Sequence, residues 1–122
     1  MSSSAQLIRA HLNMLLLAVL QRVALHGYAI REALRLGSDG RFELSEGSVY
    51  PALRRLEHIG LVASSWSVAD GRHIRTYRLT AAGRDKLRAD RRAWEEFANT
   101  ITALLVEPQA QPISPGPSDA AR

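Results

Sequence analysis

The chain has 122 residues, of which 46% are hydrophobic, enough for one compact domain and too few for two independent ones. Its 16 basic and 12 acidic residues give a formal net charge of +4, which suits a polyanionic partner such as nucleic acid. It has no cysteine, so disulfides, thiol catalysis and cysteine-based metal centres are excluded.

We expect neither a secretory signal nor a membrane span near the N-terminus. The apolar run from Met14 to Leu20 is far shorter than the roughly 20 residues that a bilayer crossing needs. Met1 to Ala10 lacks a small-residue cleavage site after an apolar core. The sequence therefore predicts a cytoplasmic protein with no membrane partner.

Two helices are predicted in the first third of the chain. Apolar residues recur with helical spacing from Ile8 to Val23, and they leave so little polar face that this helix should be buried on several sides. A second, shorter helix follows Gly27 and ends near Gly37, before a turn.

A third helix is predicted to begin around Ser45 to Ser48, either of which can cap it, and to run to Gly60. Its buried stripe is Val49, Leu53 and Leu56, which places Arg54 on the opposite side.

Two strands and a long helix follow. The segments Leu61 to Val68 and Ile74 to Leu79 favour strand, and Asp70-Gly71 between them signals a hairpin turn. Thr80 is expected to cap a long helix with an approximate heptad of apolar residues, which is typical of a dimer seam. The seam positions are Leu87, Trp94, Ile101 and Leu104 or Leu105, with Phe97 and Ala98 between.

The predicted fold is therefore mainly α with a β-hairpin wing, a winged helix-turn-helix followed by a long C-terminal helix. We expect a DNA-binding domain at residues 5–79 and a dimerisation helix at 80–106. Residues 107–122 are rich in proline and glutamine and cannot bury enough apolar surface to fold, so we expect a disordered tail.

Several short motifs follow one another along the predicted elements. They are His26-Gly27-Tyr28-Ala29-Ile30, Leu44-Ser45-Glu46-Gly47-Ser48-Val49-Tyr50-Pro51-Ala52-Leu53, Arg55-Leu56-Glu57, Gly60-Leu61-Val62, Gly71-Arg72, and Tyr77-Arg78-Leu79-Thr80 with Gly83. In these motifs and their order the sequence resembles the PadR family of regulators, and specifically its compact subgroup with a single C-terminal helix. The resemblance covers about Leu12 to Leu105.

That resemblance implies a homodimeric regulator, usually a repressor, which leaves its DNA operator when a small aromatic or drug-like molecule binds. A dimer with two-fold symmetry implies a palindromic operator in duplex DNA. The wing departs from the family pattern, because Arg72-His73-Ile74-Arg75 carries fewer basic residues than the typical wing.

The DNA-contact residues are expected on the third helix and the wing. On the helix they are Ser45, Ser48, Tyr50, Arg54 and Arg55, since hydroxyl and guanidinium groups read base edges and phosphates. On the wing they are Arg72, His73 and Arg75, which would reach a phosphate or the minor groove. Two simpler explanations stay open: the serines act only as helix caps and Tyr50 only as a packing residue, and the wing residues form only a solvated turn.

Trp94 is the candidate for effector binding. In the subgroup that the chain resembles, a tryptophan at this place in the last helix stacks a flat aromatic molecule across the dimer, and a large polarizable ring suits that role. The equally weighted alternative is that Trp94 only fills the seam.

Other function classes find little support in the residues. The four histidines show no metal-ligand spacing, so neither a metal nor another cofactor is expected. No nucleophile elbow or glycine-rich phosphate loop is present, so we do not expect an enzyme. A rival hypothesis is a winged-helix protein-interaction module that has lost DNA binding.

Overall fold

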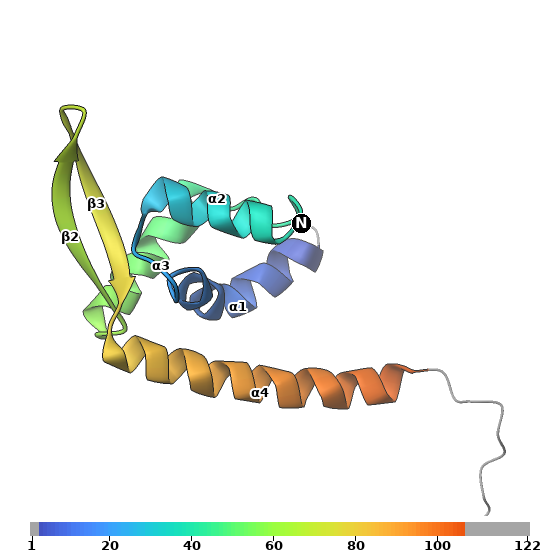
Figure 1. Ribbon diagram of the computed structural model, residues 1–122. Coiled ribbons are helices and arrows are strands. Elements are labelled where there is room, and N and C mark those ends of the chain that lie inside the picture. Colours follow the sequence, from blue (N-terminus) through green and yellow to red (C-terminus); the bar gives the residue numbers. More distant parts are fainter. Residues whose placement is uncertain (1–2, 107–122) are drawn as a thin grey trace, which may run out of the picture. The chain divides into compact units, whose positions relative to one another are not determined.

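The computed structural model describes residues 3–106, and it confirms the predicted fold class. The elements are α1 (Ser3–Val19), β1 (Leu25–His26), α2 (Gly27–Gly37), α3 (Glu46–His58), β2 (Val62–Ala69), β3 (Arg72–Leu79) and α4 (Ala81–Leu105) (Figure 1). The chain divides into two compact units, with the boundary between Arg92 and Ala93, inside α4. The predicted tail at 107–122 lies outside the described residues.

The core of the first unit is built mainly from α1, α2 and α3. Leu16 and Leu17 near the end of α1, and Leu20 directly after it, are at most 1% exposed, as their wide apolar stripe predicted. Ile30 of α2 and Leu53 of α3 are fully buried in the same cluster. Burying such side chains is worth about 1.5–3 kcal/mol each, so this cluster fixes how the three helices pack.

The hairpin forms as its sequence predicts. Strands β2 and β3 are antiparallel, with Val62 opposite Leu79 at the base and Ala69 opposite Arg72 at the tip. Asp70 and Gly71 both have positive φ, 52° and 74°, as a two-residue turn between twisted strands requires. We call this hairpin, residues 62–79, the wing; Figure 1 shows it beside α2 and α3.

A third strand was not predicted. The two residues of β1 pair antiparallel with β3, Leu25 opposite Tyr77 and His26 opposite Thr76, so the strand order is β1-β3-β2. Two residues are too few for any periodic signal. The short strand ties the connection between α1 and α2 to the base of the wing.

The start of α4 is held firmly to the first unit. The Thr80 hydroxyl donates to the Gly60 carbonyl at 2.7 Å and accepts from the Gly83 amide at 3.0 Å, so it caps the helix as predicted. A Cβ on Gly83 would lie 2.0 Å from the Leu61 carbonyl oxygen, so the close approach requires glycine. Leu87, expected in the seam, is instead buried in the core of the first unit.

In the second unit, α4 continues from Ala93 to Leu105 with apolar side chains exposed to solvent. These side chains are Trp94, Phe97, Ile101, Leu104 and Leu105. Every helix within residues 3–106 is too short or too polar to cross a membrane.

Candidate nucleic-acid interface

One face of α3 is committed to the core and the other to solvent. Val49, Leu53 and Leu56 are at most 1% exposed, while Arg54 and Arg55 are exposed, as predicted from their positions on the helix. Periodicity of this kind is what an α-helix needs to dock on a protein and present polar groups outward. The exposed face carries two guanidinium groups that are free to point at a polyanion.

The N-terminus of α3 is capped by its own serines. Ser45 Oγ accepts from the Ser48 amide at 3.2 Å, and the two hydroxyls lie 3.2 Å apart. Both residues are exposed, so the capping role does not withdraw them from solvent. The remaining amides of this helix end, with the positive end of its dipole, favour a nearby phosphate.

Tyr50 joins α3 to the start of α2. Its ring lies against Gly27, where a Cβ would come within 2.3 Å of the ring carbon Cε1. The Tyr50 side chain is half-buried and packs partly on the core. Tyr50 therefore has a packing role, which was the simpler explanation for it. Its remaining surface lines a cleft.

That cleft, of about 540 Å³, lies between the helices and the wing. It combines basic and aromatic groups, the composition that suits phosphates and the faces of bases or sugars. Its basic residues are Arg54, Arg72, Arg75, His26 and His73, and its aromatic ones are Tyr28, Tyr50, Trp66 and Tyr77.

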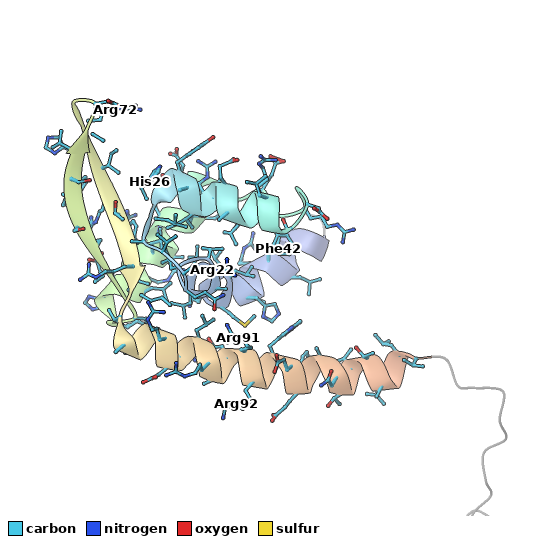
Figure 2. All side chains as sticks on the ribbon, viewed as in Figure 1. Arg22, His26, Phe42, Arg72, Arg91 and Arg92 are labelled. Atoms are coloured by element: carbon cyan, nitrogen blue, oxygen red, sulfur yellow. The ribbon has the colours of Figure 1, made fainter. Side chains whose placement is uncertain are left out.

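The wing residues differ in how they are held. Arg72 and His73 are exposed at the tip, where Figure 2 labels Arg72, and the His73 ring meets the edge of Trp66 at 6.5 Å. Arg75 lies further down the wing and is half-buried; its Nη2 donates to Glu57 of α3 at 2.9 Å. The guanidinium of Arg75 is thus already engaged within the protein.

The structure brings together only some of the predicted site residues. Tyr50, Arg54, Arg72, His73 and Arg75 line the one cleft. The three others lie apart from it: Ser45 and Ser48 border a hollow next to α1, and Arg55 lies in another with Asn13.

Sequence reasoning missed four polar or aromatic residues of the cleft, His26, Tyr28, Trp66 and Tyr77. Trp66 is 62% exposed, and it lies on the same face of β2 as Val62 and Ser64. Strand alternation would have placed Trp66 on the helix-facing side of the wing. His26 and Tyr28 stack on each other at the junction of β1 and α2. No sequence pattern predicted this contact.

Two opposite charges on α2, in a separate hollow that shares Tyr28 with this cleft, compensate each other. Arg35 donates to both carboxylate oxygens of Glu32, at 3.0 and 3.3 Å. That hydrogen bonding lowers the pKa of Glu32 below its ordinary value and raises the pKa of Arg35. The arginines that line the cleft come instead from α3 and the wing.

Comparison with known proteins agrees with this geometry. Residues 16–89 match the model of the Transcriptional regulator PadR-like family. Transcriptional regulator Rv3488 of Mycobacterium tuberculosis is 50% identical over 60 residues, which are 49% of this chain and 56% of that protein. The match thus spans little more than half the length of that relative.

Solved structures extend the likeness to most of the chain. A PadR family transcriptional regulator from Eggerthella lenta is 31% identical, with a TM-score of 0.74, and the match covers 85% of this chain and 89% of that one. A transcriptional regulator from Clostridium thermocellum has a TM-score of 0.76 at 24% identity, covering 83% of this chain and 99% of that one. At that identity the second likeness concerns the fold alone.

The helices α1, α2 and α3 are followed by the β-hairpin wing, and α3 presents a polar outer face. This arrangement defines a winged helix-turn-helix protein. The family match covers more than half of the chain and includes all of α2, α3 and the wing. This chain belongs to the PadR family, whose members named above are transcriptional regulators.

Proposed function

We propose that this chain binds duplex DNA sequence-specifically as a homodimer and represses transcription in the cytoplasm. The observation that carries the proposal is the cleft of about 540 Å³, which is lined by both Arg54 of α3 and Arg72 of the wing tip. Cationic side chains from a helix and an adjacent hairpin suit contacts with base edges and phosphates of neighbouring grooves.

In this proposal α3 enters the major groove. Arg54 and Arg55 on its exposed face, with Tyr50 at the cleft, reach base edges or phosphates. Ser45 and Ser48 lie at the helix N-terminus, where hydroxyl and amide groups favour a phosphate. Arg72 and His73 at the wing tip extend the contact to the backbone or the minor groove.

The test is selection of duplexes from a random-sequence pool by the purified wild-type protein, followed by titration of a selected duplex. Arg54→Ala should weaken binding by about 1–3 kcal/mol, as loss of one bidentate base contact does, without lowering thermal stability. Arg92→Ala is the matched control, because Arg92 is an exposed arginine on α4 (Figure 2) and its loss removes the same charge.

The outcome also distinguishes DNA binding from the rival hypothesis of a protein-interaction module. Failure of the wild-type protein to retain any duplex above random would favour a protein-interaction module on the same fold. Binding that ignores salt would equally contradict a phosphate-tracking surface, because each neutralised phosphate should contribute about 0.9 to the slope of log K against log salt.

Dimerisation is supported by the second half of α4. Phe97, Leu104 and Leu105 are all more than half exposed, and burial against a second copy would recover about 25 cal/mol per Å² of that surface. A two-fold symmetric dimer places two α3 helices in successive grooves, so the proposed operator is palindromic.

Release by a small planar effector is the last part of the proposal. Trp94 is 42% exposed, and its ring centroid lies 6.2 Å from that of Phe97 with the planes tilted by 42°. An exposed indole on the apolar face of α4 suits stacking of a flat ligand between two subunits. In a Trp66→Phe variant, Trp94 fluorescence should respond to planar aromatic compounds; no response across phenolic and cationic panels would leave Trp94 a packing residue.

A further inference from the structure

The helix-facing side of the wing changes character along its length. At the base, Val62, Tyr77 and Leu79 are buried in the core. Towards the tip, Trp66 is exposed. Arg75 lies directly opposite Trp66 in the strand register, and its side chain is 35% exposed.

Three polar side chains close a hydrogen-bonded ring at this point. Arg75 donates from Nη2 to Glu57 Oε1 at 2.9 Å and from Nε to Ser64 Oγ at 2.9 Å. Ser64 Oγ donates in turn to Glu57 Oε2 at 2.7 Å. We call Glu57, Ser64 and Arg75 the latch; it joins α3 to both strands of the wing and occupies both carboxylate oxygens.

Aromatic rings hold the same guanidinium from other sides. The Cζ of Arg75 lies 5.4 Å from the centroid of Trp66 and 5.7 Å from that of Tyr77, within the range of cation-π attraction. The planar guanidinium therefore has a carboxylate, a hydroxyl and two rings as neighbours. Lysine would lose the paired donor geometry of this arrangement.

We propose that Arg75 is a positioning residue that fixes the wing to α3, rather than a DNA contact. The proposal rests on the proposed DNA-binding function and adds which residue sets the spacing between Arg54 and Arg72. A two-stranded hairpin is marginally stable by itself, so without the latch the part of the wing beyond its buried base would sample many angles. DNA binding would then have to order it, at a cost in affinity.

The two roles for Arg75 predict opposite effects of neutralising Glu57. If Arg75 bound phosphate directly, Glu57→Gln would free its charge and remove a repulsive carboxylate, and affinity for DNA would rise. If the latch positions the wing, Glu57→Gln weakens the charge-assisted bonds and affinity falls. The sign of the change therefore decides between them.

The experiment uses full-length protein and a fluorescent duplex that the wild-type chain has selected from a random pool. We expect Glu57→Gln to bind about tenfold more weakly with an unchanged salt slope, since the wing must be ordered but no phosphate contact is lost. Glu46→Gln is the matched control: it removes the same charge from α3, where Glu46 makes only a 3.6 Å pair with Arg31. It should bind as well as the wild type or better.

Exchanging the charges of Glu57 and Arg75 tests the same proposal if the single variants are unstable. Arg75→Glu should weaken binding, and the pair Glu57→Arg with Arg75→Glu should restore at least part of it, because the latch re-forms with its ends exchanged. A direct phosphate contact at residue 75 would stay lost in the reversed pair. Two results would overturn the proposal. One is a higher affinity of Glu57→Gln for the duplex; the other is a decrease of about 0.9 in the slope of log K against log salt for Arg75→Ala.

A second readout needs no DNA. In a Trp94→Phe background only Trp66 reports, and Glu57→Gln should change its emission because the guanidinium beside the ring becomes mobile. Arg78→Ala, an exposed arginine on the other face of β3, should leave it unchanged. An unaltered Trp66 signal in Glu57→Gln contradicts the latch, whereas a wild-type protein that selects no duplex contradicts only the proposed function.

Discussion

The two halves of α4 differ both in sequence and in surroundings. The first half carries Leu87 among arginines and aspartates, whereas the second half has several large apolar side chains and only Glu95 and Glu96 as charged residues. In the first half, Gly83 and Leu87 are buried against the helices and the base of the wing, and Arg84 and Arg91 donate to Gln21. In the second half, from Ala93 to Leu105, the large apolar side chains are exposed.

The difference teaches that one helix divides its apolar stripe between two tasks. The first half completes the core of its own chain, so its loss would be felt by a single subunit. The second half has surface to bury and, in our proposal, a second copy buries it. Variants in the two halves should therefore differ in whether their effect depends on protein concentration.

The largest effect is expected from Gly83→Ala in the first half. Its Cβ would meet the Leu61 carbonyl oxygen at 2.0 Å, and a backbone atom inside the packed unit has little room to move. Overpacking of this kind should cost more than about 3 kcal/mol, measured by urea unfolding. Gly37→Ala, whose Cβ would meet nothing within 4 Å, is the control and should change stability by less than about 1 kcal/mol.

Leu87→Ala should destabilise the protein by about 3 kcal/mol, because it leaves a cavity in the core of the first unit. The loss should be the same at every protein concentration, since the cavity forms within one chain. A loss that shrinks as protein concentration rises would instead place Leu87 in the seam between subunits.

Ile101→Asp should weaken the proposed dimer by about 2 kcal/mol per side chain, since it puts a carboxylate on the stripe that, in our proposal, a second copy covers. Light scattering should then report the mass of one chain where the wild type reports two. Asn99→Asp adds the same charge elsewhere on the helix and should leave the mass unchanged. Dissociation of both variants alike would point to net charge rather than to the stripe.

The smallest effect is expected from Arg91→Ala. Arg91 Nη2 donates to Gln21 Oε1 at 2.8 Å in an exposed position, so its removal should cost less than about 1 kcal/mol. Thermal melts at low and high salt provide the measurement. A cost of several kcal/mol would mean that this exposed bond, rather than Leu87, holds the first half of α4 in place.

Much of the fold was predictable because its signals are local. Ser45 caps α3, Thr80 caps α4 and Asp70-Gly71 makes the hairpin turn, each through contacts within a few residues. Leu87 was misassigned because the heptad rule does not distinguish a core position from an intersubunit one. Leu87 is buried because it joins a cluster most of whose other members lie far from it in the sequence, on α1, α2, α3 and the wing.

The candidate site was less predictable than the fold. The exposed position of Arg54 followed from helical periodicity alone. The engagement of Arg75 did not, because Glu57 lies 18 residues away on another element and only the packing of the wing on α3 brings the two together. Composition marks both residues simply as charged, and tertiary contacts decide which charge faces outward.

The short strand β1 has a consequence for the order in which the wing becomes stable. Its two residues pair with β3 across a long stretch of sequence, so closing that contact costs much chain entropy and should come late in folding. Once formed, it gives Tyr77 and Thr76 strand partners on both sides. Their amide hydrogens should exchange with solvent only on global unfolding, while those near Asp70 exchange through local opening of the tip.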